Sequence, residues 1–327
     1  MVMTSDLVVI TDCDLPGTAA DDALTAAGLR VRRAASPSAD DIVAVAADAS
    51  ALIVQWAPIT ADLLDRLPNL RFISRLGIGY DMIDVDAATE RGILVANTPA
   101  YCLDEVATHT LAMILALGRG LIGYDRAVRA GAWSAVDARP LAFRPAATTV
   151  SVIGYGRIGS LVARRCAALG FHVVVADPMV PDVDILADGL EPAPPAEAIA
   201  RADVLTLHAP LTEQTRHLVD AAALATMKPS AVLVNTCRGP LVDEEALADA
   251  LAAGSLAGAA IDVFESEPLP RSSRLRGLDS VLLTPHAAWY SPEALVDLPL
   301  HAADNVIDHW AGRAVPAIVN RVAAAAD

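Results

Sequence analysis

Short apolar runs alternate with helical patterns along most of this 327-residue chain. Strands are predicted at residues 7–10, 51–54 and 72–74, and a helix at residues 21–28 follows the first of them. Thr60 begins another helical pattern between the second and third strands, since its hydroxyl can cap a first turn. This alternation predicts parallel strands whose connecting helices cover both faces of a sheet.

A second alternating series fills the later part of the chain. Helices are predicted at residues 157–169, where Gly170 supplies the C-terminal stop, and at residues 243–251, with Gly254 shortly beyond. With these helices, the strands of this region complete a second doubly wound domain. The strands are predicted at residues 149–153, 173–176, 204–207, 232–235, 258–261 and 281–283.

Two further helical segments flank this second series. Asp104 is placed to cap a helix over residues 104–118 that is apolar on nearly every face. We therefore expect that helix to be buried between domains, between subunits, or both. An Ala-rich, Pro-containing stretch at residues 139–147 predicts a connector. The closing helix, over residues 291–312, begins with a Ser-Pro pair, and Pro299 inside it is expected to kink or break it.

The charge balance and the cysteine pattern exclude several classes of function. With 24 basic and 40 acidic residues the net charge is −16, which suits neither nucleic acid nor an anionic membrane surface. No apolar run reaches the ~18 residues of a membrane span, and the N-terminus lacks the features of a signal peptide. Four cysteines without a CxxC pair argue against a zinc site or a disulfide framework. We expect a reduced, cytoplasmic protein without a metal.

The sequence Gly-Tyr-Gly-Arg-Ile-Gly at residues 154–159 lies between a predicted strand and a predicted helix. In that context the backbone N–H groups and the helix dipole face a pyrophosphate. Asp177 follows the next strand, 18 residues beyond the last glycine, where a carboxylate binds ribose hydroxyls and repels the 2′-phosphate of NADP. A tight turn with a solvated aspartate would show the same letters, but the spacing favours NAD. The predicted cofactor contacts here are Gly154, Gly156, Arg157, Ile158, Gly159 and Asp177.

Three polar residues follow predicted strands of the second series: Arg238, Glu267 and His286. Ligands of open α/β sheets bind outside the carboxyl ends of the strands. Arginine can polarise a carbonyl or hold a carboxylate, histidine can deliver a proton near neutral pH, and a glutamate can orient the imidazolium. A histidine after a strand is often structural, however, and the sequence alone does not bring the three together.

Several blocks resemble the D-2-hydroxyacid dehydrogenase family across nearly the whole chain. They are GIGYDMID at residues 77–84, the glycine motif, NTCRG at 235–239, DVFESEP at 262–268 and TPH at 284–286. Within the family, the chain looks closest to the bacterial branch related to the C-terminal-binding-protein corepressors. That resemblance rests on AYCLDEVA at residues 100–107 and PHAAWYS at residues 285–291.

The resemblance implies a role for each matching residue. It makes Arg238, Glu267 and His286 the catalytic set. It places the substrate carboxylate against the backbone amides of Ile78 and Gly79. The remaining implied contacts are Arg75 and Trp289 for the substrate, Thr236 and Asp262 near the nicotinamide, and Pro210 and Thr215 beside the adenosine half. An ion pair for Arg75 and a plain core position for Trp289 are the alternatives.

The implied reaction is transfer of a hydride between NAD(H) and C2 of a small 2-oxo or 2-hydroxy acid. His286 exchanges the proton, Arg238 orients the substrate and Glu267 supports the imidazolium. The resemblance also implies a D product and a homodimer formed through residues 104–118. The alternative is an NAD(H)-sensing binding protein of the corepressor type without significant turnover.

The domain organisation follows from the two series of strands. We expect an α/β chain with two doubly wound parallel-sheet domains, in which a Rossmann nucleotide domain is inserted into a flavodoxin-like substrate domain. The substrate domain comprises residues 1–98 and 291–327, and the NAD-binding domain comprises residues 99–290.

Overall fold

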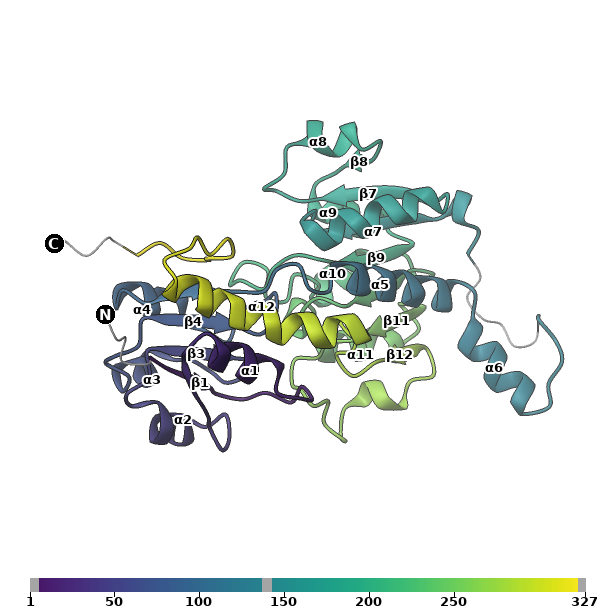
Figure 1. Cartoon of the computed structure of the whole chain (residues 1–327). Coiled ribbons are helices and arrows are strands. Elements are labelled where there is room, and N and C mark those ends of the chain that lie inside the picture. The colour runs from purple at the N-terminus through teal and green to yellow at the C-terminus, as the bar shows by residue number, and fades with distance from the viewer. Residues whose placement is uncertain (1–5, 137–142, 323–327) are drawn as a thin grey trace. The chain divides into compact units, whose positions relative to one another are not determined.

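The computed structural model describes residues 6–136 and 143–322, which form two compact units (Figure 1). The first unit comprises Met1–Cys102 and Tyr290–Asp327, and the second comprises Leu103–Trp289. Part of the connector expected at residues 139–147 lies outside the described residues, as do the first and last five residues of the chain.

The first unit is built on a five-stranded sheet in the order β2-β1-β3-β4-β5, with every neighbouring pair parallel. The three central strands are buried along their whole length, as expected of apolar strands covered on both faces. The strands are β1 (Leu7–Ile10), β2 (Arg30–Arg33), β3 (Ala51–Val54), β4 (Phe72–Arg75) and β5 (Leu94–Ala96). The helices are α1 (Ala19–Ala26), α2 (Ala39–Ala46), α3 (Ala61–Asp65), α4 (Val85–Glu90) and α12 (Pro292–Trp310).

The closing helix, α12, completes this unit. Its N-cap is Ser291, whose hydroxyl accepts a hydrogen bond from the Ala294 amide at 2.9 Å. The Ser74 hydroxyl in β4 donates to the Ala302 carbonyl of the helix at 2.9 Å, which fixes the helix against the sheet. The break expected at Pro299 is not found: this proline is buried and the helix continues through it to Trp310. Packing against the unit therefore outweighs the local cost of the proline.

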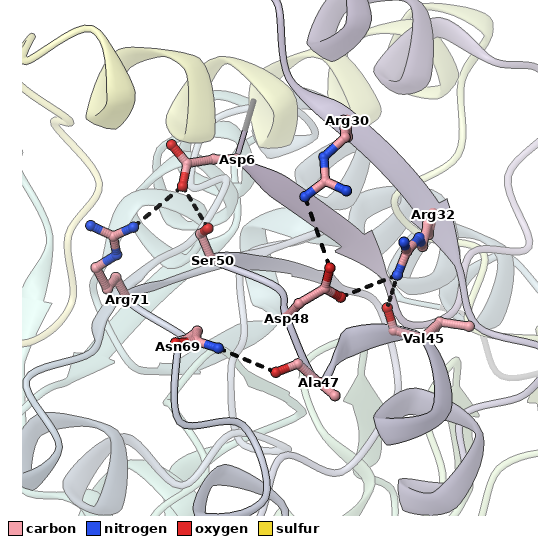
Figure 2. A network of polar contacts seen from close by, with 9 residues as sticks. All are labelled: Asp6, Arg30, Arg32, Val45, Ala47, Asp48, Ser50, Asn69 and Arg71. Carbon is pink, nitrogen blue, oxygen red and sulfur yellow. Dashed lines mark hydrogen bonds and ion pairs between the residues drawn. The ribbon is translucent and has the colours of Figure 1, made fainter. Parts of the chain in front are cut away.

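Strand β2 is one of three strands that the sequence pattern missed, together with β5 and β8 (Glu191–Pro192). Its side chains are Arg-Val-Arg-Arg, and it lies at the edge of the sheet. Figure 2 shows Asp48 between Arg30 and Arg32, at 3.9 and 3.1 Å, while Asp6 accepts from Arg71 and Ser50 nearby. Charged side chains on an edge strand discourage pairing with other chains, so the polar composition suits its position rather than contradicting strand structure.

The second unit contains a seven-stranded sheet in the order β12-β11-β10-β9-β6-β7-β8, again parallel throughout. Its strands are β6 (Thr149–Ile153), β7 (His172–Ala176), β8 (Glu191–Pro192), β9 (Val204–Leu207), β10 (Val232–Asn235), β11 (Gly258–Ile261) and β12 (Val281–Leu283). Its helices are α5 (Leu103–Gly118), α6 (Leu121–Arg129), α7 (Arg157–Ala168), α8 (Asp182–Ala187), α9 (Pro195–Arg201), α10 (Ala221–Thr226) and α11 (Glu244–Ala252).

Helix α5 begins one residue earlier than predicted. Asp104 therefore lies in the first turn rather than at the cap. In the first turn its carboxylate forms an ion pair with Arg165 of α7. Its buried side chains include Met113 and Ile114, which belong to the core of this unit. Among the described residues no single helix is long and apolar enough to cross a membrane, although α5 and α6, bent by 57° at their break, pass together on length and composition.

Candidate active site

The three glycines of the motif at residues 154–159 are needed for different reasons. Gly154 has φ +96°, and a Cβ there would lie 2.5 Å from the carbonyl carbon of His208 after β9. A Cβ on Gly159 would lie 2.0 Å from the Gly154 oxygen, so that glycine lets α7 pack on the turn. A Cβ on Gly156 would meet no protein atom within 4 Å. The space before Gly156, at the N-terminus of α7, is what a phosphate group needs.

Asp177 holds this turn from the end of β7. One carboxylate oxygen accepts from the Tyr155 amide at 2.7 Å, and the other accepts from the Met179 amide at 2.8 Å. Each oxygen keeps a further lone pair for another donor. Arg157 and Ile158 are the first residues of α7, directly after the turn. The carboxylate is therefore fixed beside the glycine turn, as binding of ribose hydroxyls requires.

His286 and Glu267 form a direct pair. The imidazole Nδ1 lies 2.7 Å from one carboxylate oxygen of Glu267, and the Phe264 amide donates to the other at 2.9 Å. Burial by itself raises the pKa of Glu267, but the hydrogen bond from His286 and the charge of Arg238 outweigh it, so this pKa lies below its ordinary value. An ionised, oriented carboxylate therefore faces the histidine.

The loop that carries His286 is held by Asp262. This side chain is fully buried, and its oxygens accept from the amides of Ala287 at 2.8 Å and Ala288 at 2.9 Å, and from the Thr284 hydroxyl. The His286 amide donates to the Asp262 carbonyl at 2.8 Å. His286 has φ +52°, an unusual value for a residue with a side chain. The surrounding hydrogen bonds hold the backbone in that conformation.

Arg238 follows β10 on a turn that packs against the Phe264 backbone. Its carbonyl accepts from the Asn235 side chain at 2.8 Å, and its own guanidinium donates to the Cys237 carbonyl at 2.7 Å. A Cβ on Gly239 would lie 1.9 Å from the Phe264 carbonyl carbon. Only a glycine permits this approach, which brings the turn after Arg238 against the loop that carries Glu267.

The comparison with known proteins follows from this geometry. Residues 111–288 match the family model described as D-isomer specific 2-hydroxyacid dehydrogenase, NAD binding domain. The chain belongs to the D-isomer-specific 2-hydroxyacid dehydrogenase family. The match confirms the predicted family, and the matched residues lie within the second unit. The α/β fold with two parallel sheets is confirmed as well.

Individual members of the D-2-hydroxyacid dehydrogenase family are similar over most of this chain. The D-3-phosphoglycerate dehydrogenase of Mycobacterium tuberculosis (strain ATCC 25618 / H37Rv) is 38% identical over 97% of this chain and 59% of its own length. The glyoxylate reductase of Korarchaeum cryptofilum is 37% identical over 88% of this chain and 87% of its own length. The structure of D-lactate dehydrogenase from Aquifex aeolicus with NAD and lactic acid has a TM-score of 0.89 at 28% identity, covering 97% and 100% of the two chains.

These similarities bear unequally on the predictions. The chain spans 55–59% of the length of the phosphoglycerate dehydrogenases that it matches. The family match, the glyoxylate reductase and the D-lactate dehydrogenase structure support the reaction class expected of a 2-hydroxyacid dehydrogenase. They do not favour the corepressor-type alternative. The closer relationship to the corepressor branch stays a prediction.

The residues that the family resemblance assigned to the substrate carboxylate lie in the first unit. The turn after β4 is pinned at Gly77, whose amide donates to the Thr98 hydroxyl at 2.7 Å, and at Ile78, whose carbonyl accepts from the Asn97 side chain at 2.7 Å. No hydrogen bond from the Ile78 or Gly79 amide is found within residues 6–136 and 143–322. Asn97 and Thr98 were missed because β5, the strand that they directly follow, was not predicted; with that strand recognised, the strand-end rule would have indicated both.

Arg75 is buried beneath this turn. It is 4% exposed, its Cζ lies 5.4 Å from the centroid of the Trp56 ring, and a Cβ on Gly77 would lie 1.6 Å from its Nη1. The guanidinium therefore places positive charge directly behind the turn that carries the Ile78 and Gly79 amides. Such a charge strengthens the attraction of those amides for a carboxylate.

The remaining predicted contacts lie in the second unit, most of them after the carboxyl ends of its strands. The Thr236 hydroxyl, after β10, lies 2.8 Å from the Thr110 hydroxyl of α5. Thr215 donates to the Pro210 carbonyl at 2.6 Å, which closes the turn after β9. Trp289 is half-buried at the end of this unit. Arg238, Glu267 and His286 follow β10, β11 and β12, and so all three lie at the carboxyl-terminal end of the strands of the second sheet.

Proposed function

We propose that this chain is an NAD-dependent D-2-hydroxyacid dehydrogenase that acts as a reductase of a small 2-oxo acid. The observation that carries the proposal is the Glu267–His286 pair, 2.7 Å apart and held in an otherwise unfavourable backbone conformation. A carboxylate with a lowered pKa stabilises an imidazolium, which is the proton donor that reduction of a carbonyl requires.

The roles of the other residues complete the proposed mechanism. When held by the glycine turn and Asp177, NADH would supply the hydride for reduction at C2 of the substrate. His286 donates a proton to the carbonyl oxygen, and Arg238 stabilises the negative charge that develops there. The amides of Ile78 and Gly79 bind the substrate carboxylate, with Arg75 behind them. Trp289 forms a wall of the substrate pocket.

The cofactor contacts are proposed on the same grounds. The glycine turn has the shape that a pyrophosphate needs, because Gly156 leaves open space at the N-terminus of α7. Asp177 binds the ribose hydroxyls and selects NAD over NADP. The other proposed contacts with NAD(H) are Gly154, Arg157, Ile158, Gly159, Pro210, Thr215, Thr236 and Asp262.

The proposal extends to the organisation of the protein. Residues 1–98 and 291–327 act as the substrate-binding domain, and residues 99–290 as the NAD-binding domain. A homodimer forms through α5, as the resemblance implies. The protein works in the cytoplasm, which is consistent with the lack of a disulfide among its four cysteines, all of which lie in the described part of the chain.

Turnover of a panel of 2-oxo acids, followed by the loss of NADH absorbance, tests the proposal. The panel contains glyoxylate, pyruvate, hydroxypyruvate, a branched and an aromatic 2-oxo acid, and a phosphorylated analogue. We expect His286→Gln to lower kcat/KM about 10²- to 10⁴-fold, and Glu267→Gln to lower it about 10- to 100-fold, the equivalent of one charge-assisted hydrogen bond.

The matched control is His172→Gln. This histidine also faces a glutamate, Glu191 at 2.8 Å, but on the exposed start of β7. Its replacement should leave kcat/KM unchanged. NADH binding without turnover of any panel member would contradict the reductase assignment and favour the sensing protein.

A further inference from the structure

A second histidine–glutamate pair lies beside the proposed catalytic pair. His217 Nε2 is 2.5 Å from Glu265 Oε1, and both side chains are partly exposed. His217 has φ +51°. Among the described residues, His217 and His286 are the two non-glycine residues with a positive φ. A side chain in this conformation is strained, and strain persists only where surrounding contacts maintain it.

His217 lies directly across from the turn that follows Arg238. Its amide donates to the Pro240 carbonyl at 2.8 Å. Two residues later, the Val219 amide donates to the Leu241 carbonyl at 3.0 Å, so the two segments run side by side. The backbone of His217 is therefore tied to the turn whose first residue is the proposed substrate-orienting arginine.

Glu265 belongs to the loop that carries the proposed catalytic glutamate. Its amide donates to Glu244 of α11 at 3.2 Å, and its neighbour Phe264 donates to Glu267 at 2.9 Å. The absent Cβ of Gly239 lets the Arg238 turn rest on the backbone of residues 264–265. The partly exposed imidazole of His217 contacts the Glu265 side chain beside this point of approach.

The pair therefore joins three loops that follow β9, β10 and β11. An isolated exposed ion pair contributes little to the free energy of unfolding. Backbone strain at one of its partners lowers that net contribution further. Here the two partners come from different loops, and the His217 backbone also contacts the turn that follows Arg238. Small displacements of positioned groups are costly in catalysis.

We propose that His217 is a positioning residue, and that the His217–Glu265 pair clamps the turn after Arg238 against the loop that carries Glu267. This inference rests on the proposed dehydrogenase function for its catalytic consequence. Neither residue contacts the reacting atoms in this assignment. The pair acts through the geometry of Arg238 and Glu267.

The test uses His217→Gly, because glycine adopts a positive φ without strain and the variant loses only the imidazole. We expect kcat to fall about 10-fold or more through misplacement of the Arg238 and Glu267 side chains. The dissociation constant of NADH should stay within about twofold and the Tm within about 2 °C. Hydrogen exchange should accelerate in residues 264–268 and 239–242.

Conservative and control variants separate the pairing from general stability. Glu265→Gln keeps an oxygen that accepts from the imidazole and should retain most activity, whereas Glu265→Ala should behave like His217→Gly. His172→Gln removes an exposed histidine from another glutamate pair and should change neither kcat nor hydrogen exchange near Arg238.

Two results would overturn the proposal. One is a wild-type kcat in His217→Gly, and the other is a loss of kcat matched by equal losses in Tm and NADH affinity, which would indicate a purely structural role. If the wild-type protein reduces no 2-oxo acid, the proposed function fails. Hydrogen exchange still decides the clamp in that case, since unchanged exchange in residues 264–268 would refute it.

Discussion

Replacement of Asp262 by asparagine isolates the contribution of one buried carboxylate to the loop of His286. Its two oxygens accept two backbone amides, at 2.8 and 2.9 Å, and the hydroxyl of Thr284. Asparagine has the same shape but offers one acceptor oxygen and a donor group in place of the second. One of the amides, at Ala287 or Ala288, then faces another donor.

The magnitude follows from these contacts. A buried donor without a partner costs about 1–3 kcal/mol, and the remaining hydrogen bonds lose their charge assistance, which lowers each from about 1.5–3 to about 0.5–1.5 kcal/mol. The reduced desolvation of a neutral side chain offsets part of this. We expect the free energy of unfolding to fall by about 2–4 kcal/mol, or the Tm by roughly 5–15 °C for a unit of this size.

Activity should fall further than stability alone explains. The His286 amide donates to the Asp262 carbonyl, and the carboxylate holds the next two amides, so a change at Asp262 moves the imidazole directly. A displacement near 1 Å corresponds to a loss in kcat of about 10²-fold. Thermal unfolding and NADH oxidation, measured well below the Tm of the variant, give the two quantities separately.

Asp203→Asn is the matched control. Asp203 accepts from the Thr149 amide at 2.8 Å and from Lys228 at 2.8 Å, at the opposite, amino-terminal edge of the same sheet. This variant should lose stability while keeping kcat. A wild-type kcat in Asp262→Asn would refute the positioning argument, and an unchanged Tm would refute the estimate of its hydrogen bonds.

Three other predictions concern the cofactor side of the seven-stranded sheet. Burial lowers the pKa of His208 to about 4 from 6.5, so the unfolded chain binds the extra proton between these values and the free energy of unfolding falls by about 3 kcal/mol as pH drops through that range. His208→Gln should remove this dependence in denaturant titrations, whereas the exposed His172→Gln should retain it. Gly159→Ala places a Cβ 2.0 Å from the Gly154 oxygen and should weaken both folding and NADH binding, by at least about tenfold in the dissociation constant. Gly156→Ala, whose Cβ meets no protein atom, should weaken NADH binding at an unchanged Tm, and a lowered Tm there would contradict the assignment of the open space to the cofactor.

The central strands of both sheets could be predicted because they are buried on both faces. The runs at β1 and β3 are continuous in apolar residues, and those at β6 and β9 are interrupted only by Thr or Ser. All four end at polar or glycine positions, and their bounds match the prediction. The edge strands differ: β12 was predicted with its observed bounds, whereas β2, β5 and β8 were not predicted. Strand β2 has three arginines that are ion-paired with aspartates, and nothing in its own letters indicates a strand.

Helix starts were predictable where a side chain closes the first turn. Thr60 and Asp243 both accept from an amide three residues later, as their positions indicated. Asp104 has the same type of side chain, but its carboxylate pairs with Arg165 of α7 and the helix begins before it. A partner 61 residues away in the chain decides between cap and ion pair, and local sequence does not contain it.

The candidate site shows the same division between local and distant information. Arg238, Glu267 and His286 became candidates because each follows a predicted strand, and the family resemblance then made them the predicted catalytic set. The groups that hold them are mostly backbone atoms, such as the Phe264 amide on Glu267 and the Ala287 amide on Asp262. Backbone donors are the same at every position of a sequence, so no residue type marks them. The glycines are the exception. A Cβ on Gly239 would lie 1.9 Å from the Phe264 carbonyl carbon, so this glycine marks where two loops of the site touch.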